Sequence, residues 1–107
     1  MQNSFRFFED SGHGWLEVPI ALCRELGLAH AITGYSYCKG DNLYLEEDCD
    51  AGTFVKAWEA ATGKEWYVKR ADGYYDRPNE KRVYHDGSSP VRNYLDAIPA
   101  DLLQKPD

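Results

Sequence analysis

Residues 35–46 read YSYCKGDNLYLE and carry the clearest structural pattern of the chain. The segments Tyr35–Lys39 and Leu43–Glu46 are typical of β-strands, and Gly40–Asn42 between them has the composition of a tight turn. We therefore expect a β-hairpin here, followed at once by an acidic run.

A second hairpin is expected closer to the N-terminus. Ser4–Glu9 and Trp15–Val18 are the strand candidates, and the glycine-containing segment Asp10–Gly14 joins them. A helix is then expected from Pro19, which suits a first helical position, to Gly27, which is a natural stop.

A clear amphipathic helix is predicted for Ala51–Thr62, with Gly63 as its stop. Further elements are expected in the second half of the chain: a strand at Glu65–Arg70, short strands at Tyr74-Tyr75 and Arg82–Tyr84, and a helix that begins at Pro90 with Ser89 as its N-cap and ends at Pro99.

Helices that alternate with hairpins, and not with single strands, predict the α+β class. We expect one domain over residues 1–107, built on a mainly antiparallel sheet of hairpins with two to three short helices, and a frayed tail at residues 104–107. The length of 107 residues, with 43% hydrophobic and 14% aromatic residues, agrees with a single packed core.

The composition also indicates where the protein works. No apolar run approaches the roughly 18 residues that span a bilayer, and residues 1–10 lack a signal-peptide pattern. Cys23, Cys38 and Cys49 form no closed disulfide set and have no zinc-site spacing. We therefore expect a cytoplasmic protein that binds no cofactor and no metal and does not associate with a membrane.

The net charge of −6 lies entirely in the first half of the chain. Residues 1–53 contain nine acidic and three basic residues, whereas residues 54–107 contain nine of each. Nucleic-acid binders usually carry the opposite sign, so this half favours a partner with a basic surface, or serves only solubility.

The acidic run Glu46, Glu47, Asp48 and Asp50 precedes the predicted helix, and three roles are open to it. Carboxylates stabilise a helix N-terminus, and Asp50 is the best-placed cap. The remaining three exceed what capping requires and would form a docking face, with Glu17 and Asp41 as further members. A hard cation is the third role, but the residues after Asp48 do not follow the calcium-loop template.

Residues 64–85 mix cations with aromatic rings, as single-strand binders do. The candidates for this alternative role are Tyr74, Tyr75, Arg77 and Arg82. Four acidic residues dilute the segment, so cross-strand packing explains its rings equally well.

Two histidines would supply the base of a small enzyme, which is the third hypothesis. His13 lies between two glycines, and His85 precedes Asp86-Gly87-Ser88. Neither is paired with a nucleophile by its position in the sequence, so we expect a protein that is not an enzyme.

Three blocks of sequence carry a resemblance: HGWLEVP at 13–19, YSY at 35–37 and YLEED at 44–48. They resemble short uncharacterised proteins of bacteriophages and other bacterial mobile elements, over roughly residues 5–58. The resemblance implies a bacterial host cytoplasm and a protein that binds and inhibits host machinery, such as a defence or CRISPR complex. It implies no catalytic residue.

Overall fold

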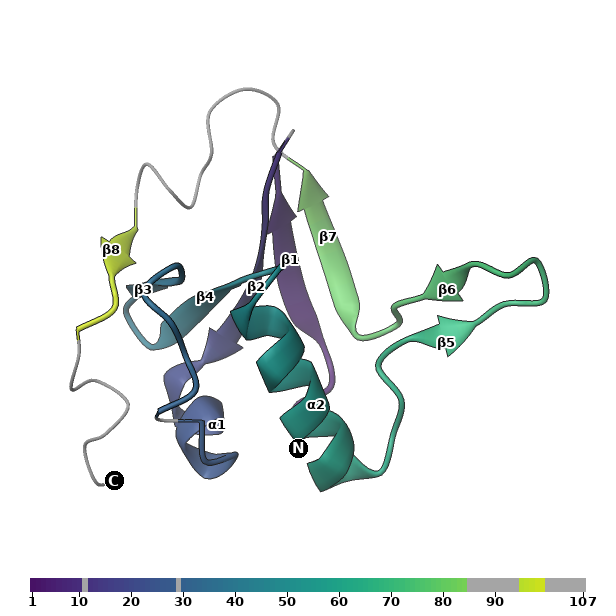
Figure 1. Cartoon of the computed structure of the whole chain (residues 1–107), viewed down its shortest axis with the longest axis horizontal. Coiled ribbons are helices and arrows are strands. Elements are labelled where there is room, and N and C mark those ends of the chain that lie inside the picture. The colour runs from purple at the N-terminus through teal and green to yellow at the C-terminus, as the bar shows by residue number, and fades with distance from the viewer. Residues whose placement is uncertain (11, 29, 85–94, 100–107) are drawn as a thin grey trace.

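The computed structural model describes residues 1–10, 12–28, 30–84 and 95–99. Six strands of this part form one sheet in the order β7-β1-β2-β4-β3-β8 (Figure 1). The elements are β1 (Phe5–Glu9), β2 (Gly14–Pro19), α1 (Ile20–Glu25), β3 (Tyr37–Lys39), β4 (Asn42–Glu46), α2 (Asp50–Thr62), β5 (Val68–Lys69), β6 (Tyr75–Asp76), β7 (Glu80–Tyr84) and β8 (Asp96–Ala97).

The main sheet is mixed. β1 pairs in parallel with β7, and the other neighbours in the sheet are antiparallel. β5 and β6 form a separate two-stranded hairpin that projects away from the sheet (Figure 1). The predicted α+β class is confirmed, and the β1–β7 pair is the one exception to antiparallel pairing between the described strands.

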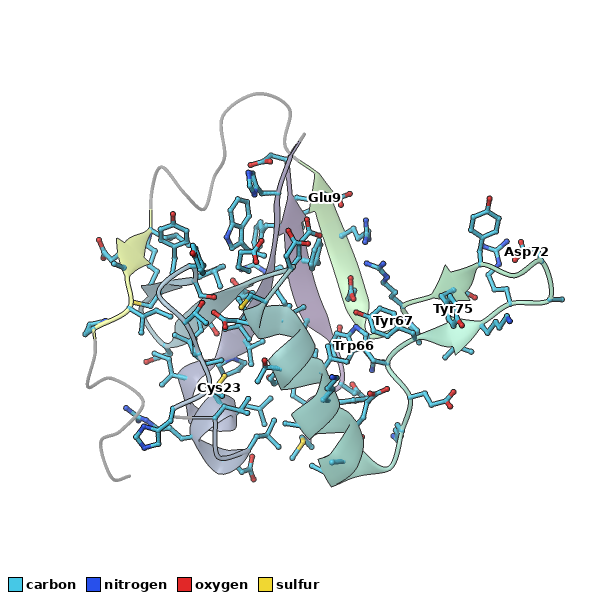
Figure 2. All side chains as sticks on the ribbon, in the orientation of Figure 1. Glu9, Cys23, Trp66, Tyr67, Asp72 and Tyr75 are labelled. Carbon is cyan, nitrogen blue, oxygen red and sulfur yellow. The ribbon has the colours of Figure 1, made fainter. Side chains whose placement is uncertain are left out.

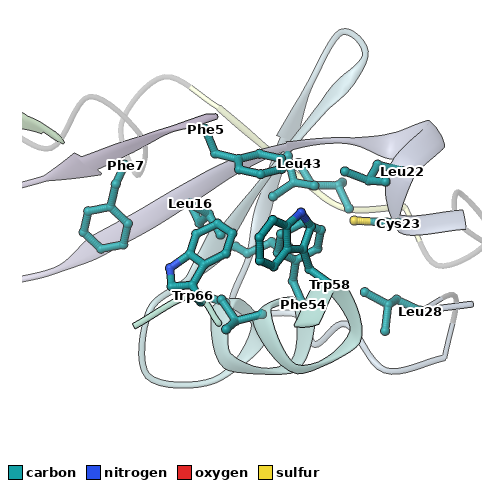
Figure 3. Close-up of a cluster of buried hydrophobic side chains, with 14 of the residues drawn as sticks. Phe5, Phe7, Leu16, Leu22, Cys23, Leu28, Leu43, Phe54, Trp58 and Trp66 are labelled. Atoms are coloured by element: carbon teal, nitrogen blue, oxygen red, sulfur yellow. The ribbon is translucent and has the colours of Figure 1, made fainter. Parts of the chain in front are cut away.

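Both helices contribute to one hydrophobic core on a single face of the sheet. Phe54 and Trp58 of α2 face Phe5, Leu16 and other alternate strand residues, as Figure 3 shows. Side chains alternate between the faces of a strand, so the sheet needs only every second residue for this core.

The two predicted hairpins and the two helices after them are confirmed, with small shifts at their ends. α1 begins at Ile20 because Pro19 is the last residue of β2. Gly27 and Gly63 follow the helices with φ of 74° and 72°, a backbone conformation that favours glycine at a helix stop.

The strand predicted for Glu65–Arg70 is wrong for most of its length. Only Val68–Lys69 form β5, and both residues are exposed. Trp66 instead turns into the core, where its ring centroid lies 5.5 Å from that of Phe5 and 5.2 Å from that of Trp58. Burial of this large ring overrides the local strand pattern.

The helix predicted from Pro90 to Pro99 is contradicted where it can be compared. Asp96 and Ala97 form strand β8, which pairs with β3. The backbone groups on the outer side of β3 accept these two residues as an added strand. Residues 85–94, with the predicted Ser89 cap, and the predicted frayed tail at 104–107 lie outside the described residues.

Candidate functional site

The face of the sheet that points away from the helices carries a second aromatic cluster. Trp15 of β2 and Tyr44 of β4 are buried there, and Phe8 and Tyr37 pack against them. The ring centroids of Phe8 and Tyr44 are 5.9 Å apart. This cluster fixes the outer surface of the sheet beside the acidic run.

Glu17 belongs to this outer face and is held by two partners. Arg6 donates to both carboxylate oxygens at 2.9 and 2.8 Å, and the Tyr44 hydroxyl donates at 2.7 Å. Burial, followed by the hydrogen bond to Glu17, raises the pKa of Tyr44 to about 12. The Glu17 side chain is only 12% exposed, so the structure places it inside the packed face and not on an open acidic surface.

A cavity of about 430 Å³ opens at the edge of this cluster. We call it the acid–aromatic pocket, and the described residues that line it are His13, Trp15, Tyr35, Tyr37, Glu46, Asp48 and Cys49. Its walls are mostly aromatic, and its two carboxylates come from the end of β4 and the turn after it.

The sheet register explains why these residues meet. Trp15 of β2 lies directly opposite Glu46 of β4, so indole and carboxylate share one face. β3 flanks β4 on the side away from β2, and there Tyr37 of β3 is paired with Tyr44 of β4. The β1–β2 turn adds His13, whose ring centroid is 5.8 Å from that of Trp15.

Backbone amides donate the hydrogen bonds that hold the residues Glu46, Glu47 and Asp48, which we call the acidic turn. The Glu47 amide donates to the carbonyl of Gly14 at 3.0 Å, and the Asp48 amide donates to Glu46 Oε2 at 2.9 Å. The turn therefore has a defined shape, and the side chains of Glu47 and Asp48 are exposed.

Like charges crowd the acidic turn. Burial and then the charges of Asp48, Glu46 and Glu9 raise the pKa of Glu47, and Arg82 opposes them in part. The ion pairs between described residues involve other carboxylates, those of Glu9, Glu17, Asp72, Asp76 and Glu80. With the other described residues the three carboxylates of the turn thus form no ion pair, and the charge of Arg82 offsets theirs only in part.

Asp50 does not cap α2 as predicted. The N-cap is Cys49, and no side chain bonds there to the first backbone amides. The Asp50 carboxylate is fully buried and accepts hydrogen bonds from the amide and hydroxyl of Thr33 and from the hydroxyl of Ser36. Ser36 Oγ in turn accepts from the Glu46 amide at 3.0 Å. Asp50 and Ser36 therefore connect the segment that carries Tyr35 to the acidic turn. The carboxylate accepts from these donors and does not cap the helix, because satisfying buried donors outweighs capping.

Asp41 lies apart from the acidic turn. It occupies the β3–β4 turn, at the opposite end of β4 from Glu46, and is exposed. Its carbonyl accepts a hydrogen bond from the Ile20 amide at 2.8 Å. The structure therefore groups Glu46, Glu47 and Asp48 and leaves Asp41 at another edge of the sheet.

The residues of the nucleic-acid alternative are only partly grouped. Tyr75, Arg77 and Arg82 line a shallow hollow of about 330 Å³, but Asp76 and Glu80 line it as well. Tyr74 and Tyr75 are 72% and 57% exposed on the projecting β5–β6 hairpin, where Figure 2 labels Tyr75.

The two arginines of that alternative already face carboxylates. Arg82 donates to Glu9 at 2.8 Å and lies 3.9 Å from Glu80, and Arg77 lies 3.8 Å from Glu80. A phosphate would have to compete with these acidic groups, which weakens this interpretation.

The structure places one of the two candidate histidines. His13 is exposed and forms one wall of the acid–aromatic pocket, and His85 lies outside the described residues. Within residues 1–10, 12–28, 30–84 and 95–99, no three His, Cys, Asp or Glu side chains are grouped to hold a metal ion.

Comparison of the chain with protein-family models, curated proteins and solved structures gives no significant match. The resemblance to phage and mobile-element proteins therefore stays a prediction. In the part of the chain that the structure describes, no helix has the length and hydrophobicity needed to cross a bilayer.

The aromatic half of the pocket was not predicted as part of a site. Trp15, Tyr35 and Tyr37 fall within predicted strands, and each looks like ordinary sheet packing when taken alone. Their signal lies in the register: a tryptophan opposite the first acidic residue, and two tyrosines two residues apart on the neighbouring strand segment.

Proposed function

We propose that this protein is a non-enzymatic binding protein whose acidic turn docks a basic surface of a partner protein. The observation that carries the proposal is that Glu46, Glu47 and Asp48, which form no ion pair with another described residue, lie beside a pocket with aromatic walls. Aromatic residues are typical anchors of protein interfaces, and complementary charge speeds association and selects the partner.

The raised pKa of Glu47 supports this interpretation. A turn that only connected β4 to α2 would gain stability from fewer carboxylates, since each of them repels the next. Retaining three of them on a turn of defined shape is the arrangement expected where binding, and not folding, uses the charge.

The resemblance to phage and mobile-element proteins suggests the nature of the partner. We infer a bacterial host protein, in the cytoplasm, whose basic surface normally handles nucleic acid, and inhibition as the outcome of docking. Carboxylates that pair with its arginines and lysines would occupy the positions of phosphates. A defence complex, including a CRISPR complex, is one such target class.

The test is affinity capture from bacterial lysate, with and without nuclease, followed by identification of bound proteins. The bait is the wild type beside the variant Glu46→Gln, Glu47→Gln, Asp48→Asn. We expect a protein that survives nuclease treatment and is lost with the variant. The purified partner should then bind the wild type more weakly as salt rises, because exposed charge pairs are screened.

A control variant removes the same charge elsewhere. Glu25→Gln, Asp41→Asn, Glu65→Gln neutralises three exposed carboxylates that lie outside the acidic turn. It should capture the partner as well as the wild type does. Equal loss with both variants would show that net charge and not the acidic turn drives capture, and retention with both would refute the proposal.

The alternative function is nucleic-acid binding through Tyr74, Tyr75, Arg77 and Arg82. The exposed tyrosines on the projecting hairpin favour it, and the neighbouring carboxylates oppose it. Titration with a fluorescently labelled single-stranded nucleic acid at two salt concentrations tests this function, since phosphate contacts produce a steep salt dependence. No binding at low salt would eliminate this function.

A further inference from the structure

The acid–aromatic pocket has the chemistry of a site for an organic cation. Its aromatic walls come from β2, β3 and the segment before β3, and its carboxylates, Glu46 and Asp48, come from the acidic turn. The faces of aromatic rings attract cations, and a nearby carboxylate adds a charged hydrogen-bond acceptor. The volume of about 430 Å³ falls within the range of small-ligand sites.

We propose that this pocket receives the guanidinium group of an arginine side chain from the partner. This inference rests on the proposed function, because it names the group through which the basic partner is anchored. The acidic turn would then attract the partner over a distance, and the pocket would hold one arginine in contact.

Three features favour arginine over lysine. The walls are largely apolar and aromatic, and a guanidinium gives up its hydration more readily than an ammonium does. A planar guanidinium also stacks on rings such as those of Tyr35 and Tyr37, which are accessible in the lining. Its several N–H groups can serve two carboxylates at once, whereas an ammonium acts as a point charge.

The pocket is held in shape before any ligand arrives. Trp15 is buried, and the ring of Tyr37 packs against the same outer cluster. The Asp50 carboxylate fixes Thr33 and Ser36, and the Tyr35 amide donates to Thr33 Oγ1 at 3.2 Å. A preorganised site binds without the cost of ordering its walls.

Tyr35 is the best position at which to test the pocket. Its side chain is 74% exposed, so its replacement removes a wall without opening the core. Tyr74 on the β5–β6 hairpin is 72% exposed and far from the pocket lining, which makes Tyr74→Leu a matched control for Tyr35→Leu. Tyr35→Phe keeps the ring and removes only the hydroxyl.

The probes are blocked single amino acids: N-acetyl-arginine N-methylamide, its lysine equivalent, and its citrulline equivalent as an uncharged isostere of arginine. Binding is followed by NMR chemical shifts of the Trp15 indole and the Cys49 amide. We expect the arginine probe to shift both signals with saturation in the millimolar range, the lysine probe to bind more weakly, and the citrulline probe to leave them unchanged.

The variants complete the test. Tyr35→Leu should weaken binding of the arginine probe roughly threefold or more, while Tyr35→Phe and Tyr74→Leu should bind like the wild type. Equal shifts with citrulline, or lysine binding as tightly as arginine, would overturn the inference. So would an unchanged affinity in Tyr35→Leu.

The two proposals fail in distinguishable ways. If the partner is captured through the acidic turn but the arginine probe does not bind, the proposed function stands and the pocket inference is wrong. If the arginine probe binds in the pocket but no partner depends on the acidic turn, the pocket binds a cation and the docking proposal is wrong.

Discussion

At the residue scale, the ionised carboxylate of Glu47 makes the acidic turn less favourable for folding. Its pKa is raised by burial and by three neighbouring carboxylates. A pKa that is higher in the folded state than in the unfolded state means that folding is favoured by protonation. The stability that protonation supplies is therefore lost as the pH rises through the folded pKa.

We accordingly predict that Glu47→Gln stabilises the protein at pH 7. The gain should be modest, up to about 0.5 kcal/mol in the free energy of unfolding, because the side chain is exposed. Urea unfolding measures it, with Glu65→Gln as a control that should change little. The advantage of Glu47→Gln should shrink as the pH falls and the wild-type carboxyl becomes protonated; a lower stability at pH 7 would contradict the argument.

Gly14, at the start of β2, lies against both the buried ring of Phe7 and the acidic turn. A Cβ placed there would lie 2.6 Å from Cε1 of Phe7 and 2.9 Å from the Glu47 carboxylate. The Phe7 ring is buried and cannot move aside freely. A side chain at this position would therefore overpack the core.

We predict that Gly14→Ala lowers the free energy of unfolding by about 1–3 kcal/mol. Gly12→Ala is the control, because nothing lies within 4 Å of its added Cβ and its φ is not positive. Chemical denaturation of both variants measures the difference. Equal stability of the two would show that the close contact at Gly14 relaxes without cost.

At the element scale, α2 is connected to the segment before β3 through one buried carboxylate. Asp50, in the first turn of α2, accepts hydrogen bonds from both Thr33 and Ser36. An asparagine has a single acceptor oxygen and would turn its amide hydrogens toward these donors. The connection between the two segments depends on the carboxylate for this reason.

Asp50→Asn is therefore predicted to destabilise the protein by about 1–3 kcal/mol, the cost of leaving buried donors unsatisfied. Asp48→Asn makes the same chemical change two residues earlier at an exposed side chain and should be nearly neutral. Thermal or urea unfolding compares them. A stable Asp50→Asn with an unchanged pocket would disprove the role assigned to this carboxylate.

The elements also show which sequence patterns were sufficient to predict a helix or a strand. α2 was predicted nearly to the residue, because its apolar stripe and Gly63 are local signals. The segment around Trp66 and the strand at Asp96–Ala97 were not, because tertiary contacts decided both. Trp66 donates from Nε1 to Glu80 at 2.6 Å and fills the core, and Asp96 pairs with Cys38 of β3.

At the scale of the whole molecule, the charge pattern predicted the acidic turn but not its surroundings. Glu46, Glu47 and Asp48 are contiguous, so their proximity follows from sequence alone. Glu17 and Asp41 share the same half of the chain, yet Arg6 and Tyr44 hold one and a distant turn carries the other. Only strand register brings Trp15 to the same place, and register depends on pairing across the sheet.

The two faces of the sheet each contain a buried group that must stay neutral. Burial, followed by the charge of Asp50, raises the pKa of Cys23 from 9.0 to about 12 on the helical side. Tyr44, on the outer side, is raised from 10.0 to about 12. Both groups stabilise the folded state while they are protonated. That contribution is lost as the pH rises from the pKa of each group in the unfolded chain toward its pKa in the folded protein.

We therefore predict that the free energy of unfolding declines between about pH 9 and pH 12, first through Cys23 and then through Tyr44 as well. For Cys23 the limiting slope is about 1.4 kcal/mol per pH unit. Urea unfolding in reducing buffer at half-unit steps measures the curve. Cys23→Ala should remove the larger part of the decline that begins near pH 9 and leave the smaller contribution of Cys38, whose pKa is also raised by burial. Cys49 is exposed, so Cys49→Ser should leave the curve unchanged. A wild-type free energy of unfolding that stays constant from pH 8 to pH 11 would show that Cys23 and Tyr44 ionise without destabilising the fold.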